Sequence, residues 1–229
     1  MKVEVLPDAE AVARRAAALI AQEARAAAAA RGRFVVATSG GTTPWRTLEL
    51  LASEDVPWPL VHLFQVDERV TTSADPARNF TKLRAALLDS VPLPENQVHA
   101  MPVEENDLSK AAERYAATLR EVAGTPPRLD LIQLGLGADG HTASLLPGDS
   151  ALDCIASDVA LTGPYEGYRR MTVTYPVLER ARLVLWIVTG SGKAGALRRM
   201  RRGDRSIPAG RVPQEHAVLL ADAAADLPP

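Results

Sequence analysis

The 229-residue sequence contains a single cysteine, Cys154, so the chain cannot form an internal disulfide. This favours a reducing compartment, and we expect the protein in the cytoplasm. Long apolar runs are also missing: Leu183–Val188, among the longest, is far shorter than the ~20 residues that a membrane-spanning helix needs. Residues 1–6 include Lys2 and Glu4 and precede no long apolar stretch, so we expect no targeting segment.

Neither sign of charge is in large excess. The 26 basic and 28 acidic residues give a formal net charge of −2. Without a surplus of positive charge, we expect neither nucleic acid nor an anionic membrane as a partner. Hydrophobic residues make up 47% and charged residues 24% of the chain, as in ordinary globular proteins, which excludes a wholly disordered or fibrous protein.

Short apolar segments alternate with helical patterns along most of the chain. The expected strands are 33–37, 60–66, 98–101, 129–134, 171–175, 183–189 and 217–220. The expected helices are 8–31 with Asp8 as cap and Gly32 as stop, one that Thr43 caps and Pro44 opens, 79–88, 107–122 and 191–200. This alternation predicts an α/β protein with a largely parallel sheet and helices on both faces. Pro126-Pro127 is the one candidate hinge, but the alternation continues through it, so we expect a single domain over residues 1–229.

The most unusual residues follow the predicted strands. They form the segments 39–42, 67–69, 137–142 and 189–193. In open α/β sheets, ligands bind at the carboxyl ends of the strands. We therefore predict that these segments converge on one active site.

The first of these segments is the turn Ser39-Gly40-Gly41-Thr42, between a predicted strand and a predicted helix. Glycines let the backbone approach a ligand closely, and the free N–H groups of a helix start favour an anion such as phosphate. An ordinary tight turn would explain the same residues equally well.

A second glycine-rich segment, Gly135-Leu-Gly137-Ala-Asp-Gly140, matches the dinucleotide-binding pattern Gly-x-Gly-x-x-Gly. That pattern requires a long helix directly after the glycines, whereas Pro147-Gly148 follows within a few residues. We therefore expect no nicotinamide or flavin cofactor.

His141 follows this segment in the same loop. A histidine can accept and return a proton near neutral pH, and Asp139 could orient its ring. A structural loop histidine is the alternative. The other histidines, His62, His99 and His216, are dispersed without the spacing of metal ligands, so no metal site is expected.

Positive side chains at other strand ends could bind phosphate or stabilise an oxyanion. The candidates are Arg69, Arg170 and Lys193. Taken alone, the segment Asp67-Glu68-Arg69 favours a solvated cluster of ion pairs. The basic stretch 198–205 indicates a solvated surface rather than a nucleic-acid site.

Together these segments resemble the signature segments of the 6-phosphogluconolactonase family, the lactonase branch of the glucosamine/galactosamine-6-phosphate isomerase superfamily. The resembling segments, in family order, are Ser39–Pro44, Val66–Val70, Leu134–Gly148, Arg170–Thr172 and Gly190–Lys193. The resemblance covers nearly the whole chain, and the Asp-Gly-His-Thr-Ala-Ser-Leu segment is its most specific part. Arg78-Asn79-Phe80 departs from the Ser-Asn-Tyr that is frequent in the family, and Leu146 replaces a frequent Phe.

The resemblance implies a hydrolase of carbohydrate metabolism that converts 6-phospho-D-glucono-1,5-lactone to 6-phospho-D-gluconate in the oxidative pentose phosphate pathway. It implies a Rossmann-like α/β fold shared with glucosamine-6-phosphate deaminases, no metal or organic cofactor, and a monomer. His141 would be the general base and acid, with Asp139 and Arg69 as further catalytic residues. The implied substrate- and phosphate-binding residues are Ser39, Gly40, Gly41, Thr42, Asp67, Asn79, Gly140, Thr142, Arg170 and Lys193.

Two alternative functions remain open for the sequence. A glucosamine-6-phosphate deaminase/isomerase resembles this chain around His141 but carries Ala-Phe-Asn-Glu-Pro next. Here residues 142–147 offer no carboxylate in that place. A non-catalytic sugar-phosphate sensor of the same fold would usually carry a DNA-binding domain, for which we expect no room in this chain.

Overall fold

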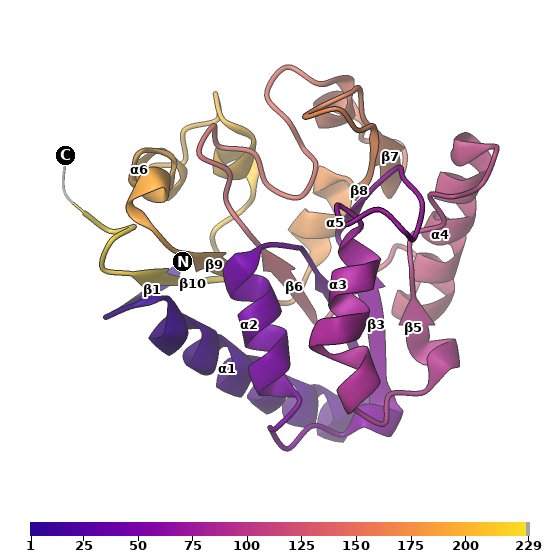
Figure 1. The fold of residues 1–229 in the computed structure, drawn as a ribbon, viewed down its shortest axis with the longest axis horizontal. Helices are drawn as coiled ribbons and strands as arrows, with labels where there is room; N and C mark the ends of the chain where they lie inside the picture. Colours follow the sequence, from indigo (N-terminus) through magenta and orange to yellow (C-terminus); the bar gives the residue numbers. More distant parts are fainter. Residues whose placement is uncertain (228–229) are drawn as a thin grey trace.

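The computed structural model describes residues 1–227, which are built around a parallel sheet (Figure 1). The sheet has seven strands in the order β1-β10-β9-β6-β2-β3-β5, and every pairing between them is parallel. The strands are β1 Lys2–Leu6, β2 Phe34–Thr38, β3 Val61–Gln65, β5 Val98–His99, β6 Leu131–Leu134, β9 Val184–Val188 and β10 Ala217–Asp222. The prediction of a largely parallel α/β sheet is confirmed.

Helices cover both faces of this sheet. They are α1 Ala9–Arg31, α2 Thr42–Leu51, α3 Asn79–Ala86, α4 Leu108–Ala123, α5 Tyr175–Arg180 and α6 Ala194–Arg201. Helices α1, α2 and α3 share one apolar core with alternate residues of the strands, and α4, α5 and α6 share the core on the opposite face. Burial on both faces explains why β2 and β9 are runs of five consecutive buried residues.

The start of the first helix matches the sequence prediction. Asp8 accepts a hydrogen bond from the amide of Ala11 at 2.8 Å, and Gly32 follows the last helical residue, Arg31. The start of α2 was predicted wrongly. Gly41 is its N-cap and Thr42 its first residue, while the hydroxyl of Thr43 pairs with that of Thr189 at 2.7 Å instead of capping the helix.

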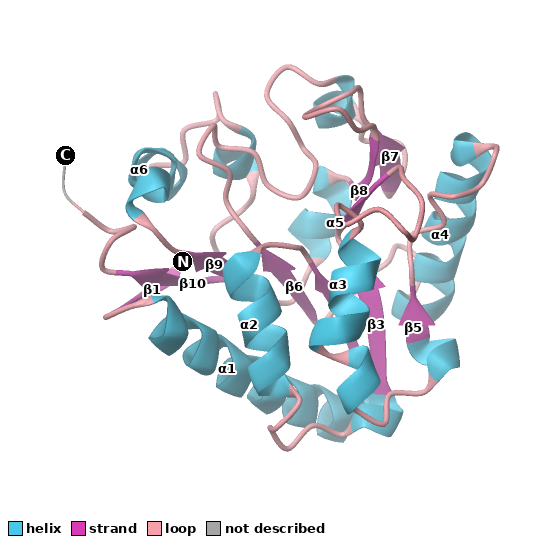
Figure 2. Ribbon diagram, in the orientation of Figure 1, coloured by secondary structure: helices cyan, strands magenta, loops and turns pink. Residues whose placement is uncertain are grey.

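A second, antiparallel sheet lies beside the main one (Figure 2). Its strands, in the order β4-β8-β7, are β4 Asp67–Arg69, β8 Arg170–Val173 and β7 Val159–Leu161. Residues 67–69 were predicted as a polar segment after a strand, and neither β7 nor the edge strand β1 was predicted from the sequence. Short 3-10 turns occupy Trp58–Leu60, Leu88–Ser90, Glu95–Gln97, Ser150–Asp153, Ser191–Lys193 and Pro208–Arg211. None of the helices in residues 1–227 combines the length and apolar character needed to cross a membrane.

Two stacked histidines at the β3–β5 edge of the main sheet predict a pH-dependent stability. The rings of His62 and His99 lie 5.5 Å apart, and burial together with the neighbouring His62 lowers the pKa of His99 to about 4. In the unfolded chain a histidine titrates near pH 6.5, so the unfolded state binds more protons between these values. We expect urea unfolding to show a loss of about 1 kcal/mol between pH 7 and pH 5, after allowance for solvent screening.

His99→Asn should remove a large part of this pH dependence, whereas His216→Asn, at an exposed position, should retain it. An unchanged pH dependence in His99→Asn would contradict the assignment.

Candidate active site

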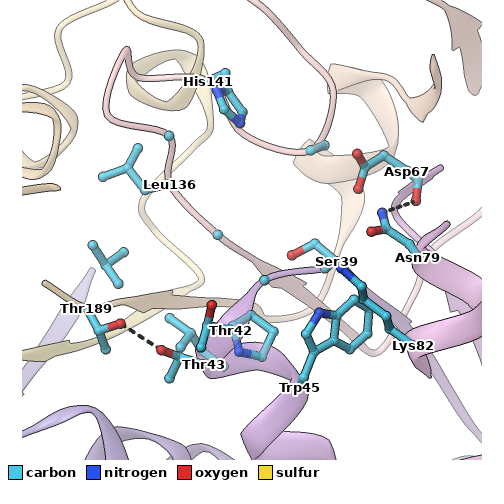
Figure 3. A pocket seen from close by; sticks show the side chains of 18 of the residues that line it. Ser39, Thr42, Thr43, Trp45, Asp67, Asn79, Lys82, Leu136, His141 and Thr189 are labelled. Atoms are coloured by element: carbon cyan, nitrogen blue, oxygen red, sulfur yellow. Dashed lines mark hydrogen bonds between the residues drawn. The ribbon is translucent and has the colours of Figure 1, made fainter. Parts of the chain in front are cut away.

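A cavity of about 480 Å³ opens at the carboxyl ends of the parallel strands (Figure 3). It lies where β2 and β6 are neighbours: the chain continues from β2 to β3 and β5 on one side, and from β6 to β9 and β10 on the other. Such a reversal of strand order is the usual ligand site of open α/β sheets. The predicted site residues that line it are Ser39, Gly40, Gly41, Thr42, Asp67, Arg69, Asn79, His141, Arg170 and Lys193.

Two predicted binding residues, Gly140 and Thr142, do not line the cavity. The backbone of Gly140 packs against Ile207, and its amide donates to the carbonyl of Gly137 at 3.0 Å. Thr142 is buried, and its hydroxyl donates to the carbonyl of Gly135 at 2.9 Å. These two residues therefore shape the loop that carries His141.

The turn after β2 presents free amides to the cavity. Gly41 has a φ of +136°, a conformation that other residues rarely adopt. Within residues 1–227, the amides of residues 40 to 43 have no hydrogen-bond acceptor. Gln133 of β6 anchors the turn, because its Oε1 accepts from the amide of Ser39 at 3.0 Å. A helix start with free N–H groups is an anion-binding feature.

His141 lies across the cavity from this turn (Figure 3). Its Nδ1 pairs with Oδ1 of Asp139 at 2.6 Å, and its own amide donates to the same oxygen at 3.1 Å. Nε2 has no partner within residues 1–227 and is the ring nitrogen left for a ligand. Asp139 itself does not line the cavity and lies on the side of His141 away from it. Burial raises the pKa of this carboxyl, but the hydrogen bonds and charge of His141, together with a hydrogen bond from Tyr165, outweigh burial and leave the pKa below its ordinary value.

Asp67, Arg69 and Asn79 form a bonded group on the β4 side of the cavity. The guanidinium of Arg69 donates to the carbonyl of Ala77 at 2.6 Å and to Oδ1 of Asn79 at 3.1 Å. The amide nitrogen of Asn79 donates to the carbonyl of Asp67 at 3.3 Å. Ser144 donates to Oδ2 of Asp67 at 2.5 Å. The Oδ1 atom of Asp67 has no partner within residues 1–227.

Glu68 lies on the side of β4 that faces away from the cavity and holds this group in place. The interpretation of residues 67–69 as a solvated cluster was therefore wrong. Side chains alternate along a strand, so Glu68 points away from the cavity while Asp67 and Arg69 face it. It is fully buried. Its carboxylate accepts from the Gln65 side chain and from the amides of Arg69, Asn79 and Phe80, all at 2.7–2.8 Å.

Arg78 supplies the counter-charge of this carboxylate. Its Nε lies 3.1 Å from Oε2 of Glu68, and its Nη1 donates to the carbonyl of Thr71 at 2.7 Å. Both charged side chains are almost wholly buried. The departure from Ser-Asn-Tyr at this point of the sequence therefore places an arginine in the interior.

Two arginines face the cavity from paired strands. Arg69 of β4 and Arg170 of β8 are directly opposite each other in the antiparallel register. Arg170 is buried, donates to Glu166 at 3.2 Å, and has an Nε without a partner in the part of the chain described. Lys193 reaches the cavity from the turn after β9, whose Gly190 amide is held by the Asp222 carboxylate at 2.9 and 3.0 Å.

Trp45 and Lys82 also line the cavity, although neither was predicted from the sequence. Lys82 lies three residues after Asn79 on α3, so both can face the same side of that helix. Helical spacing from Asn79 was the signal that could have identified it.

A parallel α/β sheet with a cavity of cations, free amides and a histidine–carboxylate pair defines a class of proteins that bind small anionic ligands at their strand ends. The sequence model of the family "Glucosamine-6-phosphate isomerases/6-phosphogluconolactonase" matches residues 7–221, and the chain belongs to this family.

Relatives within this family are similar over almost their whole length. The 6-phosphogluconolactonase of Nostoc sp. is 36% identical over 97% of this chain and 96% of the relative, and that of Mycobacterium tuberculosis is 36% identical over 99% and 98%. The crystal structure of 6-phosphogluconolactonase from Thermotoga maritima has a TM-score of 0.87 at 25% identity, covering 96% of this chain and 98% of that one. A monomeric glucosamine-6-phosphate deaminase, 19% identical with a TM-score of 0.87, covers 99% of each chain and shares the fold.

The buried ion pair of Glu68 and Arg78 leads to a stability prediction. Glu68→Gln keeps the size of the side chain but leaves the buried Arg78 charge with only the exposed Glu104, 3.8 Å away, as a partner. We expect urea unfolding to show a loss of about 3–5 kcal/mol. Glu49→Gln, which removes an exposed ion pair with Arg46, is the matched control and should cost at most about 1 kcal/mol. Equal, small losses in both variants would contradict a structural role of Glu68.

Proposed function

We propose that this protein hydrolyses 6-phospho-D-glucono-1,5-lactone to 6-phospho-D-gluconate. The observation that carries the proposal is His141, whose Nδ1 is held by Asp139 and whose Nε2 is free in a cavity that also holds cations and free amides. The lactonase names of relatives over 30% identical along almost the whole chain support the same reaction.

The phosphate group would bind at the helix start after β2. The free amides of residues 40 to 43 supply hydrogen bonds there, and Lys193 and Arg170 supply positive charge. Charged hydrogen bonds of this kind are about twice as strong as neutral ones. The unpaired Oδ1 of Asp67 and the side chain of Asn79 would accept hydrogen bonds from hydroxyl groups of the sugar and so position them.

His141 would carry out the proton transfers. A water oxygen attacks the lactone carbonyl carbon while Nε2 takes its proton, and the carbonyl becomes an oxyanion. The bond between that carbon and the ring oxygen then breaks, and protonated His141 gives its proton to the ring oxygen. Asp139 holds the ring and stabilises its charged form.

Arg69 is the donor assigned to the developing oxyanion. The loop amides of Gly140 and His141 cannot take this role, because both are already bonded within the loop. The Arg69 guanidinium, held by Ala77 and Asn79, needs no rearrangement to face the cavity.

We further propose that residues 1–229 form one domain that acts as a monomer in the cytoplasm. All the residues assigned to the site come from this one chain, so no second copy is needed to complete it. The lone Cys154 supports a reducing compartment.

His141→Ala tests the proton transfers. We expect kcat for freshly generated lactone, corrected for spontaneous opening, to fall about 10²–10⁴-fold, because general acid–base catalysis contributes that much. His216→Ala is the control, since His216 is exposed in the turn just before β10, and should retain wild-type activity. Turnover within a few-fold of wild type in His141→Ala would move the base elsewhere. Release of ammonia from glucosamine 6-phosphate, without lactonase activity, would assign the chain to deamination instead.

Lys193→Gln tests phosphate binding. The lost charged hydrogen bond should raise KM about ten-fold or more and lower kcat less. The affinity for 6-phosphogluconate as a product inhibitor should fall in parallel. Lys110→Gln, on the far helix α4, is the control and should leave both constants unchanged. Wild-type KM and product affinity in Lys193→Gln would refute this assignment.

A further inference from the structure

A two-residue hairpin turn precedes β8 and lies next to the His141 loop. Tyr165 and Tyr168 exchange backbone hydrogen bonds at 2.9 and 3.1 Å, and Glu166 and Gly167 between them both have positive φ. These are the features of a tight hairpin turn of the kind that matches strand twist. The hairpin therefore presents its two tyrosines in a defined geometry.

Tyr165 contacts three residues that the proposed function uses. Its hydroxyl lies 3.2 Å from Oδ2 of Asp139. Its ring and the His141 ring meet in an edge-to-face arrangement, with centroids 5.7 Å apart and planes at 67°. The guanidinium carbon of Arg170 lies 4.9 Å above the centre of its ring. One side chain thus links the histidine–carboxylate pair to a cation of the phosphate site.

Because of the hydrogen bond from Tyr165, the two carboxylate oxygens of Asp139 have different partners. Oδ1 receives both bonds from His141, while Oδ2 receives the bond from Tyr165. The carboxylate can then no longer rotate freely, so Oδ1 stays directed at Nδ1 of His141. Burial and the nearby Asp139 raise the pKa of Tyr165, which keeps its hydroxyl protonated and able to donate.

The contact with Arg170 acts on the other part of the site. Arg170 has few fixed partners, since its Nε has none in the part of the chain described and its one side-chain hydrogen bond goes to the exposed Glu166. An aromatic face beneath a guanidinium attracts it electrostatically and limits where it can move. The Tyr165 ring is therefore a support for this cation.

We propose that Tyr165 is a positioning residue that aligns Asp139 with His141 through its hydroxyl and holds Arg170 in place through its ring. The inference rests on the proposed lactonase activity and adds to it a residue that acts through others. Tyr165 is not among the residues that line the cavity.

Tyr168 provides a matched control on the same hairpin. Its hydroxyl donates to Asp75 at 3.1 Å, and within residues 1–227 no hydrogen bond, ring–ring or cation–π contact joins its side chain to the histidine–carboxylate pair or to Arg170. Tyr168→Phe removes one hydrogen bond of the hairpin, as Tyr165→Phe does. A difference between these two variants therefore reports on Asp139 and not on the anchoring of the hairpin.

The experiment compares kcat and KM of the wild type, Tyr165→Phe, Tyr165→Leu and Tyr168→Phe on fresh lactone, with thermal unfolding as a check on folding. Tyr165→Phe should lower kcat about 3–10-fold with KM within two-fold of wild type, because only the bond to Asp139 is lost. Tyr165→Leu should show the same loss of kcat and a several-fold higher KM, because Arg170 also loses its support. Tyr168→Phe should stay within two-fold for both constants.

Each contrary result has a distinct meaning. Wild-type constants in Tyr165→Phe and Tyr165→Leu, or equal losses in Tyr165→Phe and Tyr168→Phe, would overturn the inference and leave the proposed activity standing. An inactive wild-type protein would overturn both. If Tyr165→Leu fails to fold, the comparison of the two Phe variants still decides the role of the hydroxyl.

Discussion

One side of the site depends on the hydrogen bonds and the ion pair that the carboxylate of Glu68 forms. This carboxylate is fully buried and accepts hydrogen bonds from β4 and from the first turn of α3, with Arg78 as its counter-charge. It therefore joins the strand that carries Asp67 and Arg69 to the helix that carries Asn79. A negative charge at a helix start is also favoured by the helix dipole. The three polar side chains in the cavity keep their relative positions because this one carboxylate holds both elements.

The topology of the main sheet supplies the opposite side. The strands β2 and β6 are adjacent and parallel, but the strands that follow them in the chain lie on opposite sides of this pair. The turn at Gly41 and the loop at His141 are therefore brought to the same crevice. The small antiparallel sheet then places Arg69 and Arg170 opposite each other at its border. Cations, free amides and a histidine thereby meet around one small cavity, an arrangement that suits the proposed hydrolysis of a phosphorylated lactone.

The sequence predicted most of this architecture because parallel strands buried on both faces, such as β2 and β9, are continuous apolar runs. Most of the site residues that it predicted line the cavity, since glycines, a histidine and cations stand out after such runs. It did not predict β4, because the residues of this strand are polar and polar runs do not indicate a buried strand. Glu68 can be buried there because its carboxylate is hydrogen-bonded. Nor could it place Tyr165, because its contact with Asp139 spans 26 residues and depends on the unpredicted second sheet.

The most direct test of this account is the activity of Glu68→Gln at a temperature where circular dichroism shows it folded. Glu68 does not line the cavity, so any effect on catalysis must pass through the residues that it positions. We expect kcat/KM for the lactone to fall at least about ten-fold relative to Glu49→Gln, because small displacements of catalytic groups are costly. Wild-type kcat/KM in folded Glu68→Gln would contradict the claim that this buried carboxylate sets the geometry of the site.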